Sequence, residues 1–155
     1  ELNMLRSYFS FIDLRYEGTI TWNIMCDPAL EDAQVLNLML QPIVENAVIH
    51  GIKPLGQGRI VIAVEKKGKD LFVKVHDDGI GMEETAVSKL TAHLETDYKV
   101  PKAHESQDSI GLKNVHDRIR YRYGARYGLS IESTPGKGSV ILLTLPLVYH
   151  EASNV

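Results

Sequence analysis

Apolar residues near the start of the chain recur at spacings of three and four, which is the period of a helix. They form one seam over residues 2–16, at Leu2, Leu5, Phe9, Ile12 and Tyr16. Two heptads fit two interpretations equally well. Either the helix packs on its own domain, or it is the tail of a longer helical stalk that begins upstream.

Over residues 19–77 the spacing of apolar residues changes several times between that of a strand and that of a helix. Residues 19–26 favour a strand, which Asp27 and Pro28 end. Residues 32–50 have helical spacing, and Pro42 should kink or split that helix because proline lacks a backbone donor. The runs 59–66 and 70–77 both alternate apolar with polar residues, so they predict a hairpin.

The second half of the chain predicts a similar mixture of elements. Residues 83–95 are weakly helical, and residues 96–108 are polar with hardly an apolar anchor, which favours a mobile loop. A helix over 110–123 and strands at 128–133 and 139–146 follow. Because helices and hairpins come in separate runs, we predict an α+β fold, a two-layer α/β sandwich of one mixed sheet with helices on one face.

Composition narrows the class of protein. A chain of 155 residues that is 44% hydrophobic and 24% charged fits one globular domain. Its net charge of -3 argues against a nucleic-acid surface recognised by bulk charge. One cysteine, Cys26, excludes an intramolecular disulfide and fits a reducing compartment.

Asp77 is the first candidate for chemistry, because it ends the strongest predicted strand and starts the segment DDGIGM. Alternation puts it on the same face as the apolar residues of that strand, at the rim of the core. A carboxylate there is costly without a partner, and a ligand amino group would supply one. Gly79 and Gly81 would let the backbone approach a ring or a phosphate. The alternative is a surface turn with two aspartates.

Two helix segments carry further candidates. Asn46 and His50 are four residues apart and share one helix face, where an Asn oxygen can complete a Mg²⁺ shell of phosphate and water. The alternative is local hydrogen bonding at a helix C-terminus. Ser109 and Gly111 open the last helix, whose first N–H groups make an anion site. A plain Ser N-cap is the alternative there.

The order of four segments, ENAVIHG, DDGIGM, SIGLKNVHDRI and PGKGSV, resembles the N, G1, G2 and G3 boxes of the GHKL (Bergerat) ATP-binding fold. Within that fold, LQPIVENAVIHGI and IGLKNVHDRIRYRYG are similar to the LytS/YesM-type sensor histidine kinases of bacterial two-component systems. The resemblance covers about residues 5–146. It implies an ATP-binding catalytic domain at 18–148, the end of an upstream dimerisation helix at 1–17 and a tail at 149–155.

The resemblance also implies ATP and Mg²⁺ as cofactors and assigns roles by position. Asn46 would bind Mg²⁺, His50 would lie near the phosphates, and Asp77 would accept the adenine amino group. The other nucleotide-binding positions would be Gly79, Gly81, Met82, Ser109, Gly111, Leu112 and Ser139, with residues 83–108 as the lid over ATP. Asp78, Ser109 and Ile49 depart from the residues that are frequent in relatives, which leaves the phosphate contacts open.

The residue at position 42 helps to distinguish ATP hydrolysis from phosphoryl transfer to a histidine. Pro42 stands where gyrase-type and Hsp90-type ATPases of this fold carry a water-activating Glu, and proline cannot act as a base. A histidine kinase needs no such base, because the acceptor imidazole attacks the γ-phosphoryl directly. No histidine precedes His50, so the resemblance implies an acceptor histidine upstream of this sequence. A free-standing GHKL serine kinase or ATPase and a degenerate nucleotide-binding interaction module are the alternatives.

The same resemblance implies the partners. They are the upstream dimerisation and phosphoacceptor domain of the same protein and a response regulator, with a homodimer in the full-length protein and no nucleic acid. It also implies a cytoplasmic domain of a membrane-anchored bacterial protein, attached to the membrane only through a missing N-terminal part.

Overall fold

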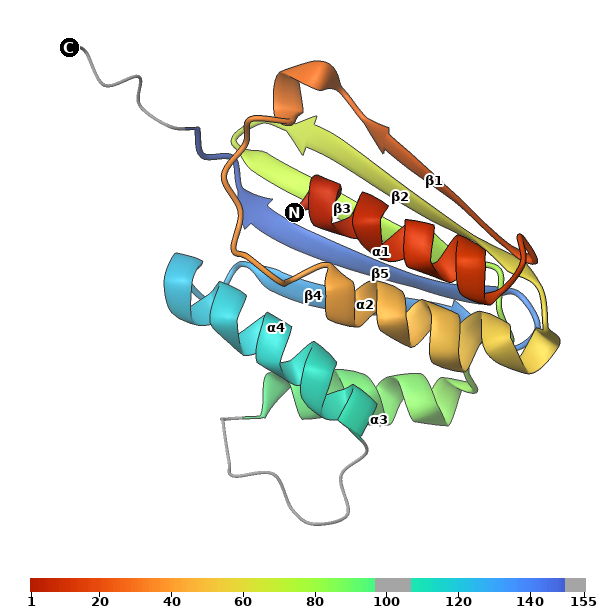
Figure 1. Cartoon of the computed structure of the whole chain (residues 1–155). Helices are drawn as coiled ribbons and strands as arrows, with labels where there is room; N and C mark the ends of the chain where they lie inside the picture. The colour runs from red at the N-terminus through yellow and green to blue at the C-terminus, as the bar shows by residue number, and fades with distance from the viewer. Residues whose placement is uncertain (97–106, 150–155) are drawn as a thin grey trace.

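A five-stranded mixed sheet forms one layer of the structure (Figure 1). The computed structural model describes residues 1–96 and 107–149, with the side chains of 107–109 left out. The strands are β1 (Ile20–Cys26), β2 (Gly58–Lys67), β3 (Asp70–Asp77), β4 (Gly128–Thr134) and β5 (Gly138–Pro146). Their order is β1-β2-β3-β5-β4, and only β1 and β2 pair in parallel.

The helices form the second layer, on one face of the sheet (Figure 1). They are α1 (Leu2–Arg15), α2 (Gln41–Asn46), α3 (Glu84–Glu95) and α4 (Gln107–Tyr123), with short helical turns η1 (Pro28–Leu30), η2 (Ala47–Ile52) and η3 (Lys53–Leu55). The predicted α+β sandwich is therefore confirmed. Every helix in the described ranges is too short or too polar to span a bilayer.

The core lies between the two layers because alternate residues of each strand point toward the helices. Fully buried side chains from the sheet meet fully buried side chains from the helices, among them Ile60, Ile62, Leu143, Ile43, Ile52, Leu112 and Ile119. The other residues of β3, such as Lys74, face away from the helices. Packing of one sheet face against the helices thus accounts for the period-two pattern of the hairpin sequence.

The seam of α1 packs on its own domain. Leu5, Phe9 and Ile12 are buried, and the Phe9 ring stacks on Trp22 of β1 with centroids 4.7 Å apart and planes at 7°. The Trp22 indole N–H also donates to the Asp13 carboxylate, at 3.1 and 3.2 Å from its two oxygens. This geometry favours the first of the two interpretations for α1. Continuation of the helix upstream stays a prediction.

The prediction for residues 32–50 is wrong in its first half. Residues 31–40 form an irregular loop, joined to the C-terminal region by a bridge between Ala33 and Tyr149, and α2 begins only at Gln41. Pro42 lies in the first turn of α2, where a missing N–H removes no hydrogen bond. Pro42 therefore starts the helix instead of kinking it, and after Asn46 the helix widens into the π-helical turn η2.

The other predicted elements are confirmed to within a few residues. α4 begins at Gln107, three residues earlier than expected, so Ser109 lies inside the helix and is not its N-cap. Most of the polar segment predicted as a mobile loop, residues 97–106, and the end of the predicted tail, residues 150–155, lie outside the described residues.

Two phenylalanines of α1 give a matched test of how this helix is packed. Phe9→Ala removes a fully buried ring and should lower the free energy of unfolding by about 3–5 kcal/mol. Phe11 is 52% exposed, so Phe11→Ala should cost less than about 0.5 kcal/mol. Urea unfolding of both variants measures the difference. Similar losses in the two would contradict the packing of α1 on the sheet.

Candidate functional site

Asp77 is the last residue of β3 and is only 5% exposed. Its register partners are Ile60 on β2 and Ser139 on β5. Burial raises the pKa of its carboxyl above the ordinary 3.8, and the backbone N–H groups of Gly79 and Ser139 lower it in opposition. The Gly79 N–H donates to Oδ1 at 2.9 Å. Alternation along β3 therefore places a carboxylate at the rim of the core, as the sequence predicts.

Asp77 lines a small hollow of about 60 Å³ between the end of β3, η2 and α4. Most of the predicted site residues line it as well. They come from five different segments and are Asn46, His50, Gly81, Met82, Leu112 and Ser139. Residues that are distant in sequence thus meet around one buried carboxylate. Ala47, Gly51 and Ile141, which complete the wall, were not predicted.

Asn46 and His50 both reach this hollow, as their shared helix face predicts. Asn46 ends α2 and His50 lies in the π-helical turn, where its side chain is largely exposed. Glu45 does not line the hollow, and its Oε1 accepts a hydrogen bond from the Gln41 amide at 2.8 Å. Among the residues that line the hollow, Asp77 is the one with a carboxylate.

Gly79 and Gly81 are glycines for reasons of packing. A Cβ on Gly79 would lie 2.2 Å from the carbonyl carbon of Gly51. A Cβ on Gly81, whose φ is +66°, would lie 2.0 Å from the carbonyl oxygen of Thr134. The sequence suggested that these glycines admit a ligand. The structure shows that close backbone contacts by themselves require glycine at both positions, and Gly79 does not line the hollow.

Gly111 differs from these two glycines. A Cβ there would have only the Pro42 Cβ near it, at an ordinary 3.7 Å. Gly111 borders a wider opening of about 390 Å³ together with Leu38, Pro42 and Asn114. Within the described residues, no packing contact requires a glycine at this position. As far as the described residues go, the space beside Gly111 is therefore open to a ligand.

Ser133 is a site residue that sequence reasoning missed. Its hydroxyl accepts the Met82 N–H at 2.8 Å, donates to the Gly138 carbonyl at 2.9 Å and lies 2.9 Å from the Ser139 hydroxyl. It therefore joins two predicted site residues. The predicted strands 128–133 and 139–146 held a signal, because antiparallel pairing of the two strands makes Ser133 and Ser139 cross-strand partners.

Asp78 points away from the hollow. Its Oδ1 accepts the Arg59 N–H at 2.6 Å, and its own N–H donates to the Arg59 carbonyl at 3.2 Å. Both bonds tie the end of β3 to the start of β2. The departure from the usual residue at this position thus affects the sheet and not the lining of the hollow.

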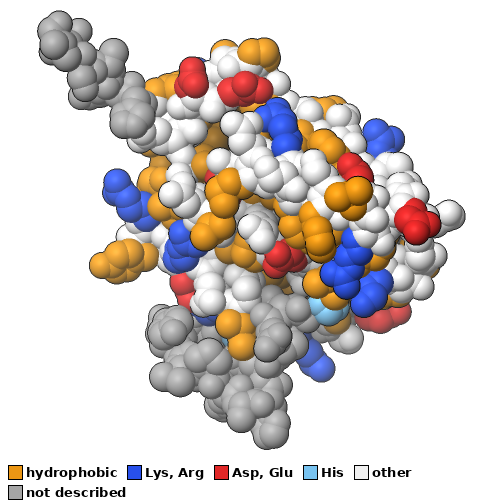
Figure 2. All heavy atoms as spheres, in the orientation of Figure 1, with side chains coloured by type: hydrophobic (Ala, Val, Ile, Leu, Met, Phe, Trp, Pro, Cys, Tyr) orange, Lys and Arg blue, Asp and Glu red, His pale blue; other side chains and the backbone are white. Residues whose placement is uncertain are grey.

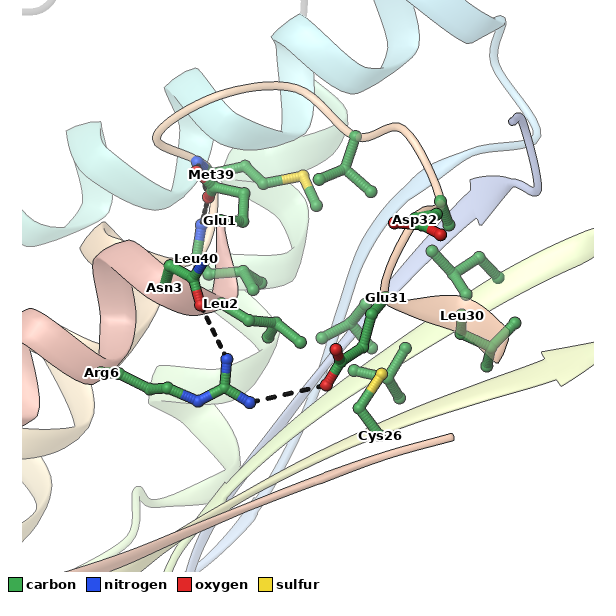
Figure 3. Close-up of a pocket in the computed structure, with 15 residues that line it drawn as sticks. Glu1, Leu2, Asn3, Arg6, Cys26, Leu30, Glu31, Asp32, Met39 and Leu40 are labelled. Carbon is green, nitrogen blue, oxygen red and sulfur yellow. Dashed lines mark hydrogen bonds and ion pairs between the residues drawn. The ribbon is translucent and has the colours of Figure 1, made fainter. Parts of the chain in front are cut away.

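A larger cavity of about 240 Å³ lies at the other end of the sheet (Figure 3). Three of the four charged residues that line it bind one another or other polar groups of the protein. Arg6 donates to Asn3 at 2.9 Å and pairs with Glu31 at 3.7 Å. Glu1 accepts three backbone N–H groups. The hollow at Asp77, with its buried carboxylate, is therefore the better candidate site.

The residues that line the hollow do not by themselves provide a set of metal ligands. No group of three or more His, Cys, Asp or Glu side chains in the described part of the chain is placed to hold an ion. A metal bound beside Asn46 would therefore need most of its ligands from another molecule, which suits a Mg²⁺ ion that keeps few protein ligands.

The fold matches that of solved catalytic domains of histidine kinases. The catalytic domain of ThkA is 17% identical, with a TM-score of 0.61 over 96% of this chain and 95% of that one. The mycobacterial sensor histidine kinase MprB is 13% identical, with a TM-score of 0.64 and the same coverage. At these identities the likeness shows a shared fold.

The chain belongs to the family of histidine kinase-, DNA gyrase B- and HSP90-like ATPases, whose sequence profile matches residues 31–149. The protein YwpD of Bacillus subtilis is 32% identical over 149 residues. A sensor-like histidine kinase of Staphylococcus epidermidis is 29% identical over 152 residues, and the sensor protein kinase HptS of Staphylococcus aureus is 28% identical over 147. The matches cover 95–96% of this chain but only 49%, 28% and 27% of those relatives.

Alanine at two glycines tests the distinction between packing and open space. Gly79→Ala places a methyl group against backbone atoms and should lower the free energy of unfolding by about 3 kcal/mol or more. Gly111→Ala meets open space on a helix and should raise it by up to about 1 kcal/mol. Thermal unfolding of both variants measures these changes. A large loss in Gly111→Ala would contradict the open space over α4.

Proposed function

We propose that this chain is the ATP-binding catalytic domain of a sensor histidine kinase of the LytS/YesM type. It donates the γ-phosphoryl of ATP to a histidine upstream of these residues, for relay to a response regulator. The observation that carries the proposal is the buried Asp77 carboxylate facing Asn46 and His50 across one hollow. Family membership and the sensor kinases among the relatives support it.

The proposal extends to the rest of the protein. Residues 18–148 are the catalytic domain, residues 1–17 connect it to an upstream dimerisation and phosphoacceptor domain, and residues 149–155 are a tail. The full-length protein is a homodimer, anchored in the membrane through its N-terminal part, with this domain in the cytoplasm. The relatives are two to four times longer than their match to this chain, which supports further parts outside these residues.

The adenine ring is recognised by Asp77. An ionised carboxylate accepts a hydrogen bond from the exocyclic amino group of adenine, and that bond offsets part of the cost of burying the charge. The walls beside Asp77 are apolar and suit a flat ring, since Ala47, Met82, Leu112 and Ile141 line them. A hollow of about 60 Å³ is well below the roughly 300–1,000 Å³ of ligand pockets. Binding therefore requires these walls to open.

Mg²⁺ and the phosphates bind on the α4 side of the hollow. Asn46 would hold Mg²⁺ through its side-chain oxygen, which suits an ion that takes few protein ligands. The phosphates lie along the start of α4, where Gly111 leaves room and Ser109 and Leu112 flank it, with His50 nearby. Mg²⁺ neutralises part of the phosphate charge when it is bound.

Transfer to a histidine fits the hollow better than hydrolysis. Pro42 has no side-chain base, and Glu45 is held by Gln41 outside the hollow. Neither residue of α2 can therefore activate a water molecule at the phosphates. Phosphoryl transfer to an imidazole needs positioning and charge neutralisation instead.

Asp77 and Asp78 give a matched pair of variants for testing the adenine site. Mg-ADP should bind the parent with roughly -5 to -8 kcal/mol, and Asp77→Asn should weaken binding about 30-fold or more. Asp78→Asn also removes one negative charge, but its side chain points to β2, so it should bind like the parent. Calorimetric titration of the three proteins measures the affinities. Equal affinity of Asp77→Asn and the parent would refute the adenine contact.

The variant Asp77→Asn should change nucleotide affinity and folding stability in opposite directions. Burial raises the pKa of Asp77, so its charged form destabilises the folded protein at pH 7. Asp77→Asn should therefore raise the free energy of unfolding while it weakens nucleotide binding. No binding of Mg-ADP to the parent would refute the kinase proposal, and steady ATP hydrolysis by the isolated chain would favour an ATPase.

A further inference from the structure

The Glu1 side chain holds the turn that precedes α2. Its Oε2 accepts the Leu38 N–H at 2.7 Å, and its Oε1 accepts the N–H groups of Met39 and Leu40 at 2.8 and 3.0 Å. Figure 3 shows Glu1 against Met39 and Leu40 at the edge of the large cavity. One carboxylate thus binds three consecutive N–H groups, and we call this contact the Glu1 clamp.

The clamp joins two segments that are far apart in the sequence. The Glu1 carbonyl accepts the Leu5 N–H at 3.0 Å and so begins α1, whereas its side chain makes no capping bond to α1. The side chain instead reaches residues 37 to 39 positions later. Leu38 has a φ of +58°, a left-handed conformation that turns successive N–H groups toward one anion. The loop therefore has a strained conformation that matches the carboxylate.

Packing and hydrogen bonds both hold this loop, because Met39 and Leu40 are buried in the core and polar groups of α1 and α4 bind its backbone. On one side of the loop is the cavity of about 240 Å³, which Met39 and Leu40 help to line. On the α4 side, the Arg118 guanidinium donates to the Asn37 carbonyl at 2.7 Å. The loop is thus tied to α1 by Glu1 and to α4 by Arg118. Loss of the clamp would remove the hydrogen bonds that tie the loop to α1.

α2 starts directly after Leu40, the last residue that Glu1 binds, and its other end reaches the hollow. The helix runs for six residues, from Gln41 to Asn46, so a shift of Leu40 moves Asn46 as well. Leu38 and Pro42 also border the opening beside Gly111. The clamp is therefore one of the contacts at the start of α2, beside the buried Ile43 and Val44, and the space assigned to the phosphates lies between this helix and α4.

We infer that Glu1 is a positioning residue that couples α1 to the nucleotide site. Displacement of α1 releases the loop, moves Asn46 away from Asp77 and weakens nucleotide binding. The inference rests on the proposed function of the hollow. By linkage, nucleotide binding strengthens the clamp by the same factor. α1 is the element at the N-terminal end of the domain, so the coupling gives a preceding segment control over nucleotide affinity.

The test uses Glu1→Ala, Glu1→Asp and a control, Glu31→Ala. Glu1→Asp keeps a carboxylate at the start of α1, where Asp is a good N-cap, but it is one methylene too short for the loop. Glu31 lies on the same cavity and makes only a half-exposed ion pair with Arg6, so its loss should change little. We expect both Glu1 variants to weaken Mg-ADP binding about five- to tenfold and Glu31→Ala to bind like the parent.

Backbone amide signals separate coupling from a merely structural role. In the absence of nucleotide, both Glu1 variants should increase hydrogen exchange at Leu38–Leu40 and shift the amide resonance of Asn46. If the variants only melt at a lower temperature, with unchanged Mg-ADP affinity and an unchanged Asn46 resonance, the inference is overturned. If the parent binds no nucleotide, the proposed function fails, and the Asn46 resonance still decides whether Glu1 and α2 are coupled.

Discussion

A backbone contact between Gly51 and Gly79 sets the geometry of the hollow. The Ile80 N–H donates to the Gly51 carbonyl at 2.9 Å, and a Cβ on Gly79 would lie 2.2 Å from the Gly51 carbonyl carbon. Gly51 follows His50 directly, so the contact presses the π-helical turn against the end of β3. Any larger residue at 79 would separate the two segments. The approach of two glycine backbones therefore brings Asn46 and His50 opposite Asp77.

The energetic cost of the site is concentrated in one group. Asp77 is 5% exposed, and burial of its charge is only partly compensated by backbone N–H donors. The rest of the molecule supplies the stability, through the layer contacts of the core and through α1, whose Phe9 stacks on Trp22. A buried charge that weakens the folded state while a ligand could satisfy it is typical of functional sites.

The sequence predicts what depends on local periods and misses what depends on distant partners. Alternation along residues 70–77 placed Asp77 on the buried face, because a strand alternates whatever packs against it. Helical spacing failed over residues 32–40, because Pro42 favours a helix start and the Glu1 carboxylate holds Leu38–Leu40 in a turn. The steric need for Gly79 was likewise invisible, since it comes from Gly51 across the fold.

The proposed nucleotide binding depends most directly on recognition of the adenine amino group by Asp77. Inosine diphosphate carries an oxygen in place of that amino group, so it offers an acceptor where Asp77 requires a donor. Calorimetric titration of the parent with the two Mg-nucleotides should show at least about tenfold tighter binding of ADP. The preference should disappear in Asp77→Asn. Equal affinity of the parent for both nucleotides would contradict the account.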